Sequence, residues 1–219
     1  MIASFPELHL GRPPRVLLLG AHSDDIEIGC GGAVQVLAAR FPAIELRWTV
    51  LSAAGERAAE TRRAAELLLP KSASIQFDLR TFRESYFPYL GADIKDFMQS
   101  MSSQYSPDLI FTHFADDKHQ DHRIVSELTR NAYRDHLILE YEVVKYDGDL
   151  ESPNIFVPLD QAQLRRKVSS LMEAFGSQKS KHWFTEDTFT SLMRLRGVEC
   201  RSPTGYAEAF HCRKLRLFA

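Results

Sequence analysis

Apolar-rich runs alternate with segments of helical periodicity through the first 135 residues of the chain. The runs that predict buried strands are 16–20, 46–51, 75–77 and 109–112. The segments whose composition or apolar spacing predicts helices are 33–40, 56–69 and 91–104. Strands that alternate with helices are joined by right-handed crossovers, which place neighbouring strands parallel. The pattern therefore predicts an α/β fold: a mainly parallel, Rossmann-like sheet with helices on both faces.

The remaining sequence continues this pattern less regularly. Asp121 is expected to cap a helix, Asp160 to cap another, and Gly197 to end a helix over 186–196. Strands are expected over 140–146 and 206–211, with an irregular loop on the substrate side over 147–158. Three glycines that precede the segment 33–40 are expected to form tight turns, because glycine tolerates strained backbone; they are Gly29, Gly31 and Gly32.

Length and composition limit the classes of protein that the chain can represent. The 219 residues, 44% hydrophobic and 26% charged, fit a single domain over 1–219. A net charge of -2 argues against nucleic-acid binding, and no apolar stretch is long enough for a membrane span. The N-terminus does not resemble a signal peptide, and three cysteines without a CxxC pair suit reduced thiols. A cytoplasmic protein is expected.

Two polar clusters follow predicted strands, and they carry the candidate chemistry. His22, Asp24 and Asp25 come after the run 16–20. The second cluster comes after the run 109–112 and includes His119, Asp121 and His122. Ligands and metals gather at the carboxyl edge of such sheets, and imidazole with carboxylate is a typical donor set for a catalytic zinc ion. The sequence therefore predicts a mononuclear metal hydrolase.

Local spacing suggests which chemical role each of these residues could have. A turn can bring His22 and Asp25 onto one ion, whereas the neighbouring Asp24 points elsewhere and can act as general base on the ion's water. One of His119 and His122 can be the third ligand, which leaves the other as an acid or oxyanion stabiliser. Asp121 can orient an imidazole, cap the helix, or do both.

The same residues carry a family resemblance. The motifs are Ala21-His22-Ser23-Asp24-Asp25, then Gly29-Cys30-Gly31-Gly32, and later His119-Gln120-Asp121-His122. They resemble those of the PIG-L/LmbE-like family of metal-dependent N-deacetylases. Weaker similarity at Arg57-Ala58-Ala59-Glu60, Ser177-Gln178 and Gly205-Tyr206-Ala207-Glu208-Ala209-Phe210 extends it over about residues 15–212. The chain departs from the family pattern at Ser23, Ile26 and Asp117, where other members have Pro, Glu and, in some, Tyr.

The resemblance implies a function and assigns roles. His22, Asp25 and His122 would bind the metal, usually zinc, with another ion such as Fe²⁺ as an alternative. Asp24 would be the general base, and His119, oriented by Asp121, its electrostatic or acid partner. The substrate would be a small molecule that carries an N-acetylglucosamine-type sugar. Glu208 becomes a candidate substrate-binding residue through the similarity of the tail, and a homo-oligomer is compatible with the sequence.

Several alternatives remain open at this point. A metal hydrolase of another amide or of a phosphoester would use similar residues, and so would a non-catalytic metal-binding protein. Arg57 could meet a substrate phosphate or carboxylate, or form a surface ion pair. His113 could support the site or simply pack. The segment His182-Trp183-Phe184 could be a lip on which a sugar stacks, or a packed corner.

Overall fold

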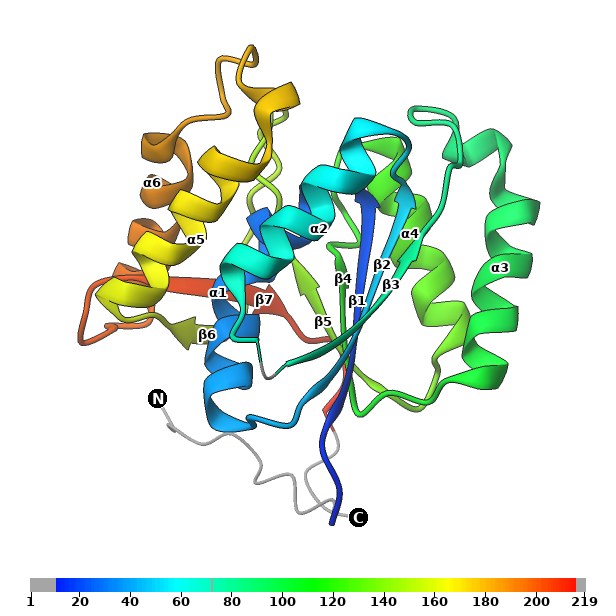
Figure 1. The fold of residues 1–219 in the computed structure, drawn as a ribbon, viewed down its shortest axis with the longest axis horizontal. Coiled ribbons are helices and arrows are strands. Elements are labelled where there is room, and N and C mark those ends of the chain that lie inside the picture. Colours follow the sequence, from blue (N-terminus) through cyan, green and yellow to red (C-terminus); the bar gives the residue numbers. More distant parts are fainter. Residues whose placement is uncertain (1–10, 72, 216–219) are drawn as a thin grey trace.

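A seven-stranded sheet forms the centre of the protein (Figure 1). The structure is a computed structural model and describes residues 11–71 and 73–215. The strand order is β3-β2-β1-β4-β5-β7-β6, and the first five strands of that order run parallel. These five are β1 (Arg15–His22), β2 (Glu45–Ser52), β3 (Ser74–Leu79), β4 (Leu109–His113) and β5 (Leu137–Tyr141). The order places β1 beside β4, so the two predicted clusters leave the sheet next to each other.

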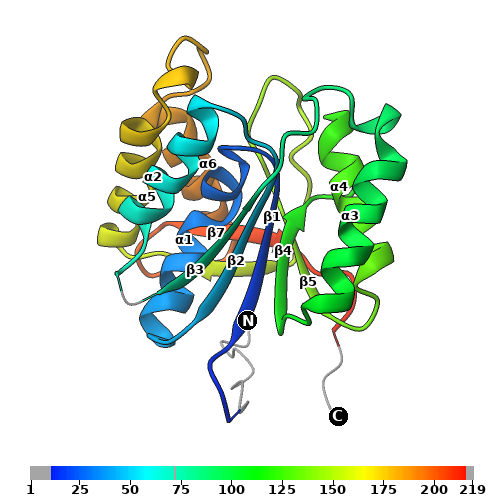
Figure 2. The same cartoon turned by 45° about the vertical axis from the view of Figure 1, so that its right-hand side comes forward.

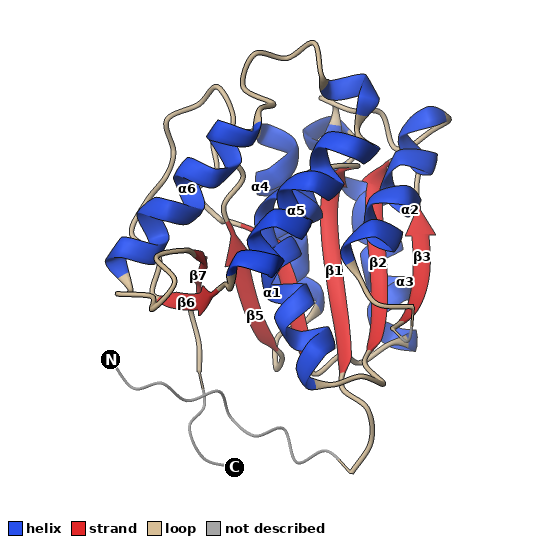
Figure 3. Cartoon of the chain, turned by 60° about the vertical axis from the view of Figure 1, so that its left-hand side comes forward, coloured by secondary structure: helices blue, strands red, loops and turns tan. Residues whose placement is uncertain are grey.

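Two antiparallel strands complete the sheet at one edge (Figure 3). β7 (Ala207–His211) pairs with β5, and β6 (Ile155–Pro158) pairs with β7. The expected loop over 147–158 was therefore wrong in part, because its last residues form β6. The expected strand over 140–146 is also shifted, since β5 ends at Tyr141 and the following residues turn away toward the site.

Helices cover both faces of the sheet, as Figure 2 shows edge-on. One face carries α1 (Asp25–Arg40), α2 (Glu56–Leu68), α5 (Gln161–Ala174) and α6 (Glu186–Glu199); the other carries α3 (Gly91–Gln104) and α4 (Gln120–Ala132). Two short 3-10 helices, η1 (Phe87–Tyr89) and η2 (Gly176–Gln178), lie in connections. Side chains of β1 alternate between two cores: Leu18 faces the first group of helices, and Leu17 and Leu19 face the second. The predicted fold class is confirmed.

Helix ends explain two further differences from the sequence pattern. His119, not Asp121, is the N-cap of α4, and its side chain accepts the N–H of Asp121. α6 continues past Gly197 to Glu199, and that glycine lets the helix lie against the backbone of Gly205. Asp160 caps α5 as predicted, with Gln163 completing a capping box. No helix among residues 11–71 and 73–215 is long and apolar enough to cross a membrane.

The glycines of the first motif lie inside a helix, which corrects the turn prediction. α1 begins at Asp25, directly after the catalytic candidates, and runs through Gly29, Gly31 and Gly32. A Cβ on Gly29 would overlap the ring of Tyr141, and one on Gly32 would approach Leu159 to 2.5 Å. These glycines therefore let α1 lie unusually close to the sheet and to the segment before α5, which holds its first turn in place at the site.

Replacing Gly29 by alanine should destabilise the protein, because the ring of Tyr141 is fully buried and its hydroxyl donates to the carbonyl of Leu19. We expect Gly29→Ala to lower the free energy of unfolding by about 1–3 kcal/mol, measured by urea denaturation. Gly91→Ala is the matched control, since a Cβ at that helix position meets nothing within 4 Å. It should leave stability unchanged or raise it by up to about 1 kcal/mol. Equal stability of the two variants would contradict the close approach.

Candidate metal centre

The two polar clusters meet at the carboxyl edge of β1 and β4. His22 ends β1, Asp25 opens α1, and His122 lies in the first turn of α4. His22 Nδ1 lies 3.3 Å from His122 Nε2 and 3.4 Å from Asp25 Oδ2. Asp25 Oδ1 lies 3.5 Å from His122 Nε2, and all three residues are buried. Two imidazoles and a carboxylate from distant parts of the chain thus converge on one point.

Each of the two imidazoles is held from behind by a second carboxylate. His22 Nε2 donates to Asp121 Oδ2 at 3.1 Å, and His122 Nδ1 donates to Asp117 Oδ2 at 2.9 Å. A nitrogen that donates in this way carries the hydrogen of the neutral ring, so the other nitrogen presents its lone pair. Both lone pairs then face the same point beside the Asp25 carboxylate. This carboxylate–histidine arrangement is typical of metal-ligating histidines.

The spacing of the two imidazole nitrogens fits two ligands of a tetrahedral ion. With ligand bonds of about 2.0–2.2 Å, the ligand atoms of a tetrahedral site lie about 3.3–3.6 Å from one another. The 3.3 Å between the two imidazole nitrogens and the 3.4 Å from His22 Nδ1 to Asp25 Oδ2 fall within that range, whereas the 3.5 Å from His122 Nε2 is to the other carboxylate oxygen, Oδ1. His22, Asp25 and His122 are therefore candidate ligands, with each of the two Asp25 oxygens facing one imidazole.

Two other histidines lie near the three donors. One ligand atom each of His119, His22 and His122 lie within 4.8 Å of one another, and so do one each of His113, Asp25 and His122. His119 Nδ1 accepts from the N–H of Asp121, so its Nε2 carries the hydrogen. His113 Nε2 accepts from the N–H of Ala21 at 2.9 Å, so that lone pair is already used. The hydrogen bonds therefore favour the set His22, Asp25 and His122.

The electrostatics of the cluster favour bound positive charge. Burial lowers the pKa of His22, but the Asp25 charge and the Asp121 hydrogen bond raise it more, to about 10. Burial would also lower the pKa of His122, but Asp25 and Asp117 raise it above its usual value. Burial and the charge of His122 lower the pKa of His113 to about 4, so that ring stays neutral. The surroundings of His22 and His122 therefore favour positive charge. A metal cation that replaced the protons on these two rings would be stabilised by the same carboxylates.

Asp24 lies beside this cluster and faces a different partner. It is the N-cap of α1, and its Oδ1 accepts from Arg57 Nη2 at 2.8 Å. Burial raises the pKa of Asp24, and although Arg57 opposes the shift, the pKa stays above its usual value. Arg57 also donates to Ser177 Oγ at 3.0 Å. The arginine proposed for substrate binding therefore reaches the site, where it holds the carboxylate of the candidate base.

The sequence did not identify Asp117 as a site residue. Besides His122, Asp117 accepts from the N–H of His119 at 2.7 Å and lies 3.1 Å from Lys145 Nζ. Burial would raise the pKa of Asp117, but the His122 hydrogen bond and these charges lower it below its usual range. Lys145 is held in turn by Asp149. Only the Asp-x-His-x-Asp-His spacing of residues 117–122 could have suggested that a carboxylate just before α4 contacts His122.

Asp121 lies in the site, but it does not have the role that the resemblance implied. Its carboxylate accepts from His22 and from the backbone N–H groups of Ser85 and Phe87, at 2.6 and 3.1 Å for the latter two. Only its backbone N–H contacts His119. Asp121 therefore orients His22 across the site and ties the loop before η1 to it, while His119 is positioned by the start of α4.

Glu208 is not available for substrate binding. Its two oxygens accept from the N–H groups of Gly32 and Ala33 at 2.7 and 2.6 Å, and the carboxylate lies 2.5 Å from Lys167 Nζ. Lys167 also donates to the carbonyl of Ile28, in the same turn of α1. Both side chains are buried, with 4% of Glu208 and 2% of Lys167 exposed. The pair joins α1, α5 and β7, so the expected substrate role is replaced by a structural one.

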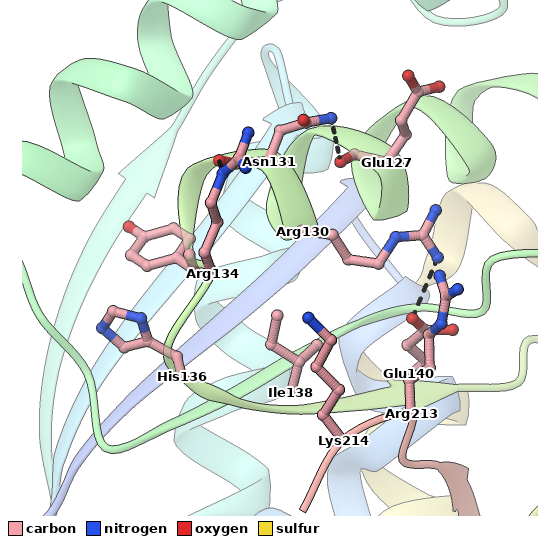
Figure 4. A pocket seen from close by; sticks show the side chains of 10 residues that line it. Glu127, Arg130, Asn131, Arg134, His136, Ile138, Glu140, Arg213 and Lys214 are labelled. Carbon is pink, nitrogen blue, oxygen red and sulfur yellow. Dashed lines mark hydrogen bonds and ion pairs between the residues drawn. The ribbon is translucent and has the colours of Figure 1, made fainter.

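A cavity of about 400 Å³ opens away from this cluster, at the other end of α4 (Figure 4). Arg130 lies 3.3 Å from Glu140 there, and Arg213 and Lys214 approach from the segment after β7. Positive charges at a helix C-terminus are favourable in any case, because they complement the helix dipole. None of the converging donors lines this cavity, so the chemistry is assigned to the edge of the sheet.

Comparison with known proteins identifies the family. The protein-family model PIG-L, described as GlcNAc-PI de-N-acetylase, matches residues 17–133, a range that contains both motifs. The chain belongs to the PIG-L family. This confirms the family resemblance expected from the motifs. A search of curated proteins found no significant match.

Solved structures share the fold across nearly the whole chain. The conserved protein TT1542 from Thermus thermophilus is 19% identical, with a TM-score of 0.72 over 93% of this chain and 96% of the other. N,N'-diacetylchitobiose deacetylase from Pyrococcus horikoshii is 18% identical (TM-score 0.65, 92% and 84% covered). 4-Carboxy-2-hydroxymuconate hydratase from Pseudomonas putida is also 18% identical (TM-score 0.66, 94% and 98% covered). At this identity the likeness describes the fold alone.

Asp117 should affect metal affinity without touching the ion. We expect Asp117→Asn to weaken metal binding by about 10–100-fold, because the amide holds the His122 ring less firmly and lowers its basicity. A chelator competition titration would measure the change. Asp116→Asn is the matched control, because Asp116 is the more exposed neighbour and should leave the affinity as it is. If both variants bound metal as tightly as the wild type, the orienting role of Asp117 would be refuted.

Glu208 should affect stability rather than substrate binding. Glu208→Ala leaves the Lys167 ammonium buried and unpaired, so we expect the free energy of unfolding to fall by about 3–5 kcal/mol, measured by urea denaturation. The double variant Lys167→Met/Glu208→Leu should recover part of that loss. A single variant with native stability and a raised KM would instead restore the substrate role.

Proposed function

We propose that this protein is a metal-dependent hydrolase that removes the acetyl group from an N-acetylated sugar. The observation that carries the proposal is the convergence of His22 Nδ1, His122 Nε2 and the Asp25 carboxylate, with Asp24 beside them. Family membership over residues 17–133 supports the same reaction. The fold alone would not be sufficient, since a hydratase shares it.

His22, Asp25 and His122 would hold the ion, and zinc is the ion we propose. When bound, such an ion lowers the pKa of a water molecule and polarises the amide carbonyl. The donor set of two imidazoles and one carboxylate is one that catalytic zinc sites use, and Fe²⁺ is the alternative for the same donors.

Asp24 would take the proton from the attacking water. Its raised pKa suits a proton acceptor, because a base works best when its pKa lies near the operating pH. Arg57 keeps the carboxylate in position through Oδ1, which leaves Oδ2 for the proton. Asp24 would then return the proton to the nitrogen of the leaving amine, so that the acid and base roles fall on one group.

His119 would stabilise the negative charge that develops on the carbonyl oxygen. Burial and the charges of His122 and His22 lower the pKa of His119, so its ring is neutral near pH 7. Since Nδ1 accepts from Asp121 N–H, Nε2 carries the hydrogen and can donate it to the oxyanion. His119 would thus act as a neutral hydrogen-bond donor and not as a protonated acid.

The cell compartment is part of the proposal. Cys30, Cys200 and Cys212 are all free, and burial raises the pKa of each thiol. Unpaired thiols of low reactivity suit a reducing environment such as the cytoplasm.

Replacing Asp24 by asparagine tests the general base. We expect Asp24→Asn to keep its metal, because the ligands are untouched, and to lose about 10²–10⁴-fold in acetate release. Metal content by elemental analysis and turnover by acetate detection would be measured on the same sample. His122→Ala is the counterpart and should lose the metal itself. Wild-type turnover by Asp24→Asn would remove Asp24 from the mechanism.

A small substrate panel tests the function as a whole. The metal-loaded protein would be incubated with N-acetyl sugars, a simple N-acetyl amine and a phosphomonoester. Acetate from the sugars supports the proposal, whereas acetate from the amine alone or phosphate release identifies another hydrolase. Bound metal with no product from any substrate would favour a non-catalytic metal-binding protein.

A further inference from the structure

Two segments outside the catalytic motifs meet at the edge of the metal centre. Residues 145–146 follow β5, and Lys145 lies 3.1 Å from Asp117, the residue that orients His122. Residues 181–183 lie between α5 and α6, just after Ser177, which accepts from Arg57. Figure 1 shows the α5–α6 connection on the side of the sheet where β1 and β2 end. One segment is therefore linked to a metal-ligand histidine and the other to the candidate base.

The side chains where these segments meet are aromatic. Tyr146 and His182 stack with ring centroids 5.1 Å apart and an interplanar angle of 22°. Trp183 presents its ring edge-on to Tyr146, at 6.4 Å between centroids. We refer to Tyr146, His182 and Trp183 as the aromatic rim.

The rim differs from the packed corner beside it. Phe184 is 2% exposed and packs against Phe175 and Phe189, so this part of the expected lip belongs to the core. Tyr146 is 69% exposed, and His182 is also exposed. Trp183 is half-buried and packs against Phe184 and Phe189, so it joins the rim to the core. The exposed rings of Tyr146 and His182 add little to the core, and exposed aromatic surface of this kind commonly marks binding.

We propose that the aromatic rim binds a second sugar ring of the substrate, next to the ring that carries the acetamido group. The inference rests on the proposed function. The apolar face of a pyranose can stack on the open face of Tyr146, and the Tyr146 hydroxyl and the imidazole of His182, 3.4 Å apart, can bond its hydroxyls. The preferred substrates would then be oligosaccharides or glycosides of at least two rings.

The chemistry around the rim favours a sugar over an acyl chain. Asp147 follows Tyr146 and is exposed, and the ammonium of the exposed Lys181 lies 5.7 Å from the centre of the Trp183 ring. An acyl chain requires a continuous apolar surface, because leaving charged groups dehydrated beside it is costly. A hydroxylated ring can satisfy these groups instead.

The test compares one-ring and two-ring substrates. Acetate release from N-acetylglucosamine and from N,N'-diacetylchitobiose would be measured with the metal-loaded wild type, Tyr146→Ala and Tyr146→Phe. We expect the wild type to prefer the disaccharide and Tyr146→Ala to lose about two- to tenfold of that preference through KM, with turnover of the monosaccharide unchanged. Tyr146→Phe keeps the ring and should keep most of the preference. Leu195→Ala, at another exposed apolar position, is the control and should change neither substrate.

The outcomes separate this inference from the proposed function. If both sugars release acetate and Tyr146→Ala keeps the wild-type preference, the rim proposal fails while the deacetylase proposal stands. If neither sugar releases acetate, the proposed function fails and the rim proposal with it. If Tyr146→Ala instead loses turnover of an octyl glycoside of N-acetylglucosamine and not of the disaccharide, the rim binds an alkyl chain and the sugar proposal is overturned.

Discussion

The structure depends most on the two carboxylates that hold the outer nitrogens of the site histidines. Asp121 fixes His22, and Asp117 fixes His122, so that two ring nitrogens point at each other across 3.3 Å. Two lone pairs at that distance repel, and a neighbouring carboxylate adds negative charge, so the arrangement is favourable only around a positive charge. Lys145 and the backbone N–H of Ser85 in turn keep these two carboxylates in place.

The contacts that hold the site histidines connect distant parts of the chain. His22 lies at the end of β1 and Asp121 on α4, while Phe87 donates to Asp121 from the short helix that precedes α3. On the opposite face, glycines in α1 let that helix approach Tyr141, and Lys167 with Glu208 ties its middle to α5 and β7. The metal centre is thus positioned by both layers of helices and not by its own loops alone.

Much of the fold, and the meeting of the two His/Asp clusters, could be predicted from the sequence, because apolar periodicity and His/Asp spacing are local properties. Helices 56–69 and 91–104 and strand 109–112 agree with the structure within a few residues. The errors concern long-range packing. Gly29 lies in a helix that packs against Tyr141, more than a hundred residues later in the sequence. Glu208 is buried because it pairs with Lys167, which is also distant in the sequence. Asp117 was passed over for the same reason, since its partners come together only in the folded chain.

The aromatic rim has one consequence for how such proteins diversify. The family match ends at residue 133, and Tyr146, His182 and Trp183 all lie beyond it. The residues proposed for proton transfer and cation binding lie in the first portion of the polypeptide, whereas the surface that would meet the distal portion of a glycan lies in the second. Exchange of two short connecting segments would then redirect such an enzyme to a new acceptor while its reaction chemistry stayed the same.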